Sequence, residues 1–309
     1  MGLNRLKCML LVSGAMAVGV PGQAQDVNGP GPAIGTEIFV SDDSDENTIV
    51  RTAVDLDLRN DGDAKRLGIR IENAWYQPLG QPTEQRQRVF LQVGDRSDGW
   101  TWSARVGTDG DDVIGSASVY DDSRFRKEFF IERDVIETPL GLERELYTTF
   151  GGAAVDLPVN DRNIFTVLAG LQEFSGENER VHLRANFVHV VKPELGLSVQ
   201  LRGRYFHSTA PGEFDYFSPR DFGQVLPVVQ LRRFIGGWQF LAVGGIGAQR
   251  FTGSDWQQAN YAELKVEGPA RGPWRAAAEV IYTDTPGNNA VQTDNYNYVQ
   301  GRFSLSRRF

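Results

Sequence analysis

Residues 298–309, the last twelve of the 309-residue chain, read YVQGRFSLSRRF. Within this stretch Val299, Phe303 and Leu305 alternate with small or polar residues, and the final residue is Phe309. Successive side chains of a β-strand point to opposite faces, so apolar residues at every second position give a strand one apolar and one polar face. The stretch therefore predicts a terminal strand that lies between an apolar and a polar environment.

The same period of two recurs through almost the whole chain. Val54, Leu56 and Leu58 alternate with charged residues, and no window carries an apolar helical stripe over three turns. Turn residues separate the alternating runs, as expected for strands joined by hairpins. The pattern predicts about sixteen strands, with about fourteen or eighteen as neighbouring counts. Their approximate positions are 35–41, 49–59, 66–76, 86–94, 99–107, 112–120, 125–136, 144–156, 162–173, 180–191, 196–207, 224–234, 237–251, 259–267, 273–282 and 296–309.

These strands are predicted to form one domain of the all-β class, a transmembrane antiparallel up-and-down β-barrel. The mean hydropathy of −0.35 is compatible with a membrane barrel. Apolar residues alternate with polar ones along each strand of such a barrel, so the average over the chain stays low. The alternative is a secreted soluble β-sandwich or propeller, which explains the alternation equally well. It does not explain the terminal aromatic strand, and no repeat of propeller length is present.

The lengths of the predicted connections agree with a barrel that crosses a membrane. The two longest, 208–223 and 283–295, both follow odd-numbered strands, whereas the tight links 60–65, 192–195 and 234–237 follow even-numbered strands. Outer-membrane barrels have short periplasmic turns and longer outward loops. We therefore expect an even strand number and both barrel termini in the periplasm.

Residues 1–24 are predicted to be a secretory signal peptide that is removed on export. Arg5 and Lys7 precede an apolar stretch from Cys8 to Val20, as in secretory signals. This stretch is shorter than a membrane-spanning anchor requires.

The remaining chain divides into a short lead-in and the barrel. Residues 25–34 are rich in Gly and Pro and are predicted to be flexible, and residues 35–309 are predicted to form the barrel. Cys8 is the only cysteine, so cleavage after Ala24 would leave no disulfide and no thiolate metal ligand.

The polar face of each strand is predicted to line the barrel interior, where both signs of charge are mixed. One interpretation is that these charges pair across neighbouring strands; the other is a hydrated pore, for which a barrel of this size is wide enough. The acidic surplus, a net charge of −8, lies mainly in the predicted outward loops around 42–46 and 109–112. The predicted interior charges are Asp55, Asp57, Arg59, Arg66, Arg70, Glu72, Arg105, Arg126, Glu128, Glu132, Asp134, Arg184, Arg202, Arg204, Arg232, Glu263, Lys265, Glu267, Arg275, Glu279 and Arg302.

No enzyme active site, cofactor site or metal site is predicted. The three histidines, His182, His189 and His207, do not lie in a pattern typical of a nucleophile and its base. Glu128 and Glu132 share a strand face, but their spacing puts them roughly 13 Å apart, too far for glycoside hydrolysis. No basic patch with interleaved aromatic residues indicates nucleic acid as a partner.

The end of the chain resembles the final strand of bacterial outer-membrane barrels. In those proteins a terminal aromatic residue is read by the barrel-insertion machinery. The resemblance implies that Phe309 is an insertion signal and that the outer membrane is the location. It also implies outer-membrane lipid, lipopolysaccharide and the insertion machinery as partners.

A second resemblance is found in the longest predicted outward loop, where residues 214–222 read FDYFSPRDF. The element from Tyr216 to Pro219 enters a late strand and resembles the C-terminal barrels of exopolysaccharide export proteins of the cellulose and poly-N-acetylglucosamine type. The resemblance extends over roughly residues 120–309. Tetratricopeptide repeats precede those barrels, and the 309 residues contain none. A separate periplasmic repeat-containing scaffold is therefore an expected partner, unless the chain is a stand-alone relative with another passenger.

This resemblance implies a passive conduit in which a growing glycan makes weak, repeated contacts with wall residues. For Tyr216 and Pro219 a purely structural role, in which Pro219 sets the turn, is equally open. The alternative functions are a general porin or small-solute channel and a non-conducting surface barrel that serves adhesion. The candidate residues of the glycan path are Tyr205, Phe206, Tyr216, Phe217, Arg184, Arg202, Arg204, Glu128 and Glu132.

Overall fold

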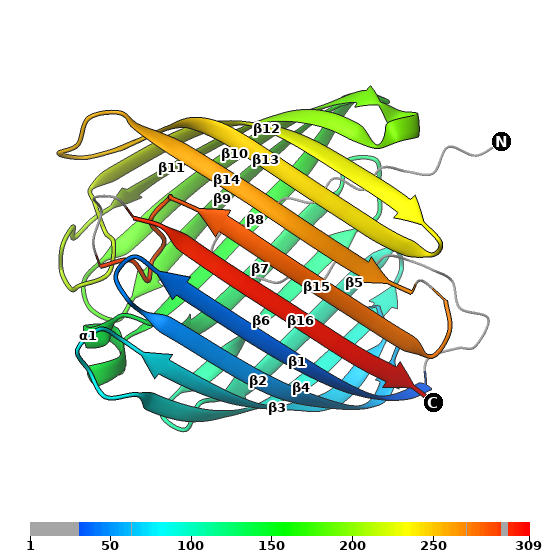
Figure 1. Cartoon of the computed structure of the whole chain (residues 1–309), viewed down its shortest axis with the longest axis horizontal. Coiled ribbons are helices and arrows are strands. Elements are labelled where there is room, and N and C mark those ends of the chain that lie inside the picture. Colours follow the sequence, from blue (N-terminus) through cyan, green and yellow to red (C-terminus); the bar gives the residue numbers. More distant parts are fainter. Residues whose placement is uncertain (1–30, 63, 270, 292–295) are drawn as a thin grey trace.

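Sixteen antiparallel strands close into one barrel in the computed structural model (Figure 1). Each strand pairs with its chain neighbours, and β1 pairs with β16 to close the sheet. The predicted fold class and even strand number are confirmed. The structure describes residues 31–62, 64–269, 271–291 and 296–309. The strands are β1 (Gly31–Asp43), β2 (Thr48–Asn60), β3 (Arg66–Gln77), β4 (Glu84–Ser97), β5 (Trp100–Thr108), β6 (Val113–Asp121), β7 (Lys127–Val135), β8 (Tyr147–Asn160), β9 (Asn163–Phe174), β10 (Glu179–Lys192), β11 (Leu197–Ser208), β12 (Asp221–Ile235), β13 (Trp238–Phe251), β14 (Gln257–Gly268), β15 (Trp274–Thr283) and β16 (Tyr298–Arg308).

The first strand begins earlier than the predicted boundary at residue 35. β1 starts at Gly31, and the Phe309 N–H donates a hydrogen bond to the Pro32 carbonyl at 2.8 Å. The Gly- and Pro-rich composition predicted a lead-in here instead of a strand. Proline lacks an N–H, but in this pair Pro32 only has to accept a hydrogen bond, so the strand can include it. The predicted signal peptide and the lead-in up to residue 30 lie outside the described residues.

The two faces of the strands meet different environments. Leu56, Ile69 and Ile71 point outward, and each is 48% exposed. A continuous outer surface of such aliphatic side chains is stable in lipid, not in water. Arg70 and Glu72 alternate with them and are buried on the inner side, as predicted.

The connections differ in length between the two ends of the barrel. Next to the termini, the two-residue turns Asp98–Gly99 and Gly236–Gly237 have positive φ at all four residues, which matches the twist of a tight hairpin. The long connections lie at the opposite end; we call them loop 4 (136–146), loop 6 (209–220) and loop 8 (284–297). Because short turns are periplasmic in bacterial barrels, we call these the periplasmic and outer ends.

Two short helices interrupt the strands, and neither was predicted from the sequence. α1 (Pro139–Glu143) lies in loop 4, and the 3-10 helix η1 (Pro193–Leu195) joins β10 to β11. No helix of the described chain is long and apolar enough to cross a membrane. The position of α1 matters for function because loop 4 turns toward the barrel mouth.

Candidate functional site: barrel interior and outer mouth

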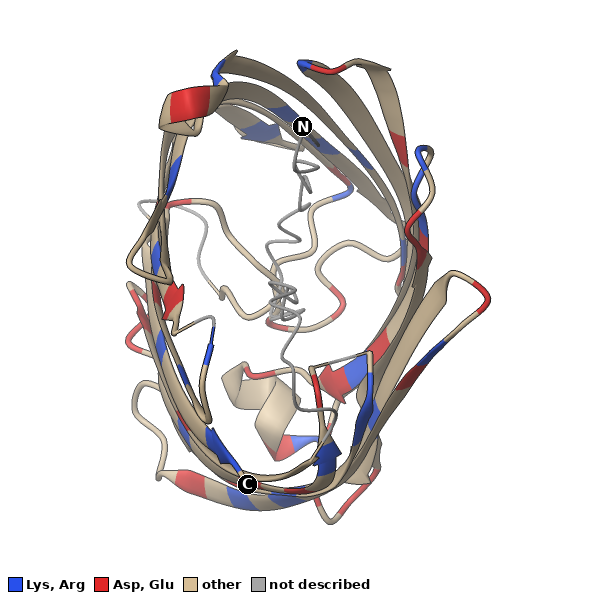
Figure 2. Cartoon of the chain, turned by 90° about the vertical axis from the view of Figure 1, so that its right-hand side faces the viewer, with Lys and Arg blue, Asp and Glu red and all other residues tan. Residues whose placement is uncertain are grey.

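Helix α1 packs against the inner wall at the outer end. Leu142 is buried in a cluster with the inward-facing Phe39, Tyr76 and Phe90, which belong to β1, β3 and β4. Loop 4 joins β7 to β8, and at least two strands separate β7 from β4, β3 and β1 in the barrel. The helix therefore reaches across part of the mouth. Figure 2, seen from the periplasmic side, shows α1 and several connections within the outline of the barrel.

Hydrogen bonds tie the three long loops to one another across the mouth. In loop 6, Asp215 Oδ1 accepts from Thr138 Oγ1 at 2.6 Å and Oδ2 accepts from the Leu140 N–H at 2.8 Å, both in loop 4. Asn289 of loop 8 donates through Nδ2 to Glu137 Oε2 of loop 4 at 2.7 Å. We call these contacts of Asp215 and Glu137 the latch.

The loops are also attached to the far side of the mouth. Glu137 forms an ion pair with Arg51 of β2, and the Val291 N–H of loop 8 donates to Asp45 Oδ2 in the turn between β1 and β2 at 2.7 Å. Loop 4 therefore bridges from β7 and β8 to β2. The described parts of the three loops form one connected layer at the outer end.

A single buried arginine attaches two loops to the wall of β10. Arg180 donates from Nη1 to Asn288 Oδ1 of loop 8 at 2.7 Å and from Nη2 to the Phe217 carbonyl of loop 6 at 2.8 Å. Its Nε donates to Ser208 Oγ at 3.1 Å, and its guanidinium lies 4.2 Å from the centre of the Phe206 ring. Arg180 therefore provides one attachment for each of loops 6 and 8.

Three of the four predicted aromatic path residues lie in the packed layer beneath loop 6. Phe206 is 0% exposed and clusters with Phe217. Tyr216 is 2% exposed and stacks on Phe174 with ring centres 4.5 Å apart. Burial raises the pKa of Tyr216 to about 12. These rings pack loop 6 against the inner wall of the barrel.

The fourth aromatic candidate, Tyr205, lies on the outer face and is 42% exposed. Adjacent strand residues point to opposite faces, so Tyr205 and Phe206 do not share a wall. The Tyr205 hydroxyl donates to Asp221 Oδ1 at 2.7 Å, and His207 Nδ1 lies 2.9 Å from the same oxygen. The hydroxyl contacts the carboxylate and not the imidazole, which differs from the nucleophile–base contact of a hydrolase.

One side of the interior consists of closely paired charges. Its members come from β1 to β4 and β7, and their nitrogen–oxygen distances range from 2.6 to 3.2 Å. Each guanidinium contacts more than one carboxylate, the acceptor whose geometry matches its own. We call this side the paired wall; it comprises Arg70 with Glu37, Asp55 and Glu72, and Arg88 with Glu72 and Asp134.

The inner face of β9 to β13 differs from the paired wall in its charged residues. At the inward-facing positions of these described strands there is no carboxylate, but there are several arginines. We call four of them, which follow one another along β10 and β11, the arginine row: Arg180, Arg184, Arg204 and Arg202. The interior is therefore electrically asymmetric, with carboxylates paired to arginines on one side and excess positive charge on the other.

Two residues of the arginine row face each other without acceptors. Arg184 on β10 pairs in register with Arg204 on β11. Within the described chain neither guanidinium donates a hydrogen bond, and both Nε atoms are buried without a partner. Arg184 lies over the ring of Phe150 at 5.8 Å, and Arg204 over Phe222 at 5.4 Å. The rings support the guanidinium planes but accept little of their charge.

The other charged candidates lie at different places on the inner wall. Arg202 donates from Nε to Gln200 Oε1 at 3.1 Å and lies deeper in the barrel than Arg204. Glu128 pairs with Arg126 at 2.8 Å on β7, and Glu132 lies on the same face. The structure thus brings Arg184, Arg202 and Arg204 together, while the two glutamates belong to another strand group.

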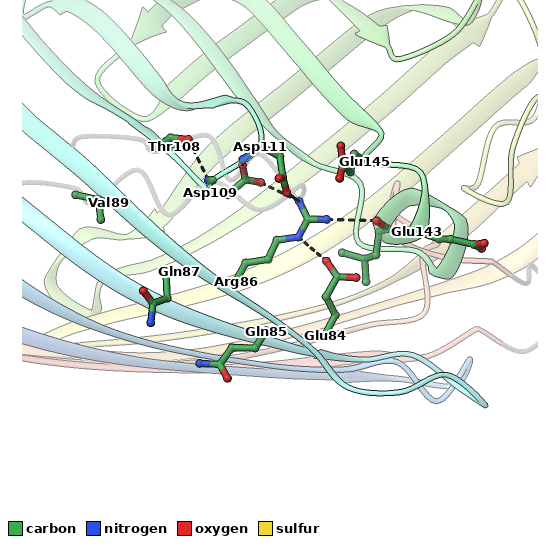
Figure 3. Close-up of a pocket in the computed structure, with 12 residues that line it drawn as sticks. Glu84, Gln85, Arg86, Gln87, Val89, Thr108, Asp109, Asp111, Glu143 and Glu145 are labelled. Atoms are coloured by element: carbon green, nitrogen blue, oxygen red, sulfur yellow. Dashed lines mark hydrogen bonds and ion pairs between the residues drawn. The ribbon is translucent and has the colours of Figure 1, made fainter.

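A cavity of about 640 Å³ opens at the outer rim between β4, β5 and α1 (Figure 3). Arg86 lies at its centre and contacts Glu84 Oε1 at 2.5 Å, Asp109 Oδ2 at 3.1 Å and the Leu142 carbonyl at 3.3 Å. These contacts hold α1 on the wall. The described residues contain no group of three or more His, Cys, Asp or Glu side chains placed to hold a metal ion.

An apolar outer surface around a closed antiparallel barrel with a charged interior defines an outer-membrane β-barrel. Known structures share this fold. One described as a bacterial polysaccharide outer membrane secretin aligns with a TM-score of 0.63 over 89% of this chain and 98% of its own, at 15% identity. At that identity the likeness is one of fold.

Other outer-membrane barrels align less closely. OccK5 of Pseudomonas aeruginosa has a TM-score of 0.43 at 10% identity, over 90% of this chain and 97% of its own. OmpT of Vibrio cholerae has a TM-score of 0.45 at 10% identity, over 90% and 97%. No protein family and no curated protein matches the sequence.

Proposed function

We propose that this protein is an outer-membrane channel that exports a polysaccharide to the cell surface. The observation that carries the proposal is the charged interior, crossed at the outer end by loops that polar contacts hold together. A barrel of this strand number is wide enough for an aqueous passage. The likeness in fold to a polysaccharide outer membrane secretin supports the choice of cargo, as does the Tyr216–Pro219 element.

In this mechanism the latch must open before a chain can leave. The contacts of Asp215 and Glu137 are hydrogen bonds and ion pairs, which exchange readily for bonds to water or to sugar hydroxyls. Such an exchange changes the free energy by only about 0.5–3 kcal/mol per bond. A polymer pushed from the periplasm could therefore separate the loops without unfolding the barrel.

The proposal is tested by recording the conductance of the refolded protein in a planar bilayer. Neutral β-linked oligosaccharides of increasing length are added on the periplasmic side. A steady current that long oligosaccharides block, but monosaccharides do not, supports a glycan channel. A current indifferent to sugars would favour a general porin, and no current from wild type or from an opened-latch variant would favour a non-conducting surface barrel.

A further inference from the structure

Arg184 and Arg204 differ from the arginines of the paired wall, Arg70 and Arg88, which carboxylates hold in place. Arg70 contacts three carboxylates and Arg88 contacts two. Arg184 and Arg204 contact no carboxylate of the described residues, although Arg184 is only 9% exposed. A buried guanidinium without an acceptor is costly, and two directly opposite like charges repel each other.

We propose that Arg184 and Arg204 form a binding site for an anionic group of the transported molecule, a carboxylate, phosphate or sulfate. The site deepens the proposed channel function, on which the transport part of this inference rests. The two guanidinium groups lie at the same level of the barrel and share one register position. Guanidinium forks match the geometry of carboxylate and phosphate oxygens, so one anion can accept from both.

Neighbouring groups favour an anion over a cation or a neutral ligand. The inward-facing positions of β9 to β13 carry no carboxylate that could compete for these arginines. Phe150 and Phe222 support the guanidinium planes and limit hydration on one side. Arg180 lies on the outer side of the pair and Arg202 on the periplasmic side. The four arginines of the row span about 20 Å of wall, counted at about 3.4 Å per strand residue.

A row of this length offers successive positions to a polymer with repeated negative charges. An anion bound at Arg184 and Arg204 can move to Arg202 or Arg180 without leaving the positive wall. Binding that is repeated and weak permits passage, whereas one tight site would trap the cargo. In the paired wall the arginines are already engaged by carboxylates, so the arginine row is the side of the interior that attracts an anion.

Calorimetric titration of the refolded protein in detergent tests the site independently of conductance. The probes are a galacturonate trimer, an N-acetylglucosamine trimer and inorganic phosphate. We expect wild type to bind the acidic trimer more tightly than the neutral one. Arg184→Gln and Arg204→Gln should each weaken acidic-trimer binding about tenfold. Arg233→Gln, which removes an arginine at the periplasmic end that contacts the Glu194 carbonyl, should leave it unchanged.

Bilayer recordings then separate this inference from the channel itself. If the barrel conducts, chloride should permeate more readily than potassium, and the double variant should lose this preference while conductance remains. Conduction with unchanged selectivity, or equal binding of acidic and neutral trimers, would overturn the anion site and leave the channel standing. Arginine-dependent binding without any current would keep the site and refute the channel. Binding of phosphate but not of the acidic trimer would assign the site to small anions and exclude a glycan.

Discussion

Replacing Asp215 by Asn should open the outer mouth. Both carboxylate oxygens of Asp215 accept hydrogen bonds from loop 4, at 2.6 Å from Thr138 Oγ1 and 2.8 Å from the Leu140 N–H. An Asn side chain has one acceptor oxygen and an NH₂ group in place of the other. The variant keeps the size of the side chain, and its NH₂ group can reach Thr138 Oγ1 only by donating to it. Both contacts with loop 4 then lose their charged acceptor.

The size of the effect follows from the lost charge at these two contacts. A hydrogen bond to a charged group contributes about 1.5–3 kcal/mol and a neutral one about 0.5–1.5 kcal/mol, so the two contacts together weaken by about 2 kcal/mol. Each 1.4 kcal/mol corresponds to about a tenfold change in an equilibrium constant. The ratio of open to closed loops should therefore rise about tenfold to a hundredfold. Single-channel recording in a planar bilayer measures this ratio directly as the fraction of time spent open.

Glu213→Gln is the matched control because it makes the same acid-to-amide change in the same loop. Glu213 accepts from the backbone N–H groups of Glu177 and Asn178, at 2.6 and 3.0 Å. These residues belong to the neighbouring turn between β9 and β10, so the bonds do not cross the mouth. The control should leave the open fraction within about threefold of wild type. Equal opening by both variants, or no change in Asp215→Asn, would refute the latch.

Three further outcomes are expected. Arg70→Ala should destabilise the barrel by about 3–5 kcal/mol, measured from thermal unfolding, because Glu37, Asp55 and Glu72 lose their common partner; unchanged stability would mean that the paired wall is not structural. The pKa of Tyr216 is raised to about 12 from about 10 in an unfolded chain. Its contribution to loop stability should therefore be complete below pH 10 and be lost as the pH rises through 12, and Tyr216→Phe should remove one late step from a tyrosinate absorbance titration. Deletion of Phe309 should reduce the amount of barrel inserted in cells several-fold but not refolding into detergent; equal insertion would argue against its role as a signal.

The strands could be predicted from the sequence because their information is local. Alternation along each segment determines which residues face lipid, and the lengths of the connections indicate which ends are periplasmic. The same rule separates Tyr205 from Phe206, since neighbours on a strand must face opposite ways. Applied to that pair, alternation alone would have removed Tyr205 from the glycan path.

The loop layer and the charge pairs could not be predicted from alternation, because they depend on contacts between residues that are distant in sequence. α1 has only five residues, too few for a helical period, and it is stabilised by the burial of Leu142 and by Asp215, distant in sequence. Arg88 meets Asp134 three strands away, and Arg51 meets Glu137 of loop 4. Alternation assigns an inward orientation to each of these strand arginines. It does not show that Arg70 has carboxylate acceptors whereas Arg184 has none among the described residues, because this depends on how the strands pair around the barrel.

The latch and the arginine row lie in series, in an order that suits outward transport. A polyanion entering from the periplasm meets Arg202 first, then Arg184 and Arg204, and finally Arg180, which holds loops 6 and 8. There a carboxylate competes with Asn288 Oδ1 and the Phe217 carbonyl for one guanidinium, and a charged acceptor forms the stronger bond. The arriving polymer would thus loosen the loops that block its exit. Under the proposed function, a polyanion approaching from outside would meet those loops before it reached Arg184, Arg204 or Arg202, so the same geometry would favour export over uptake.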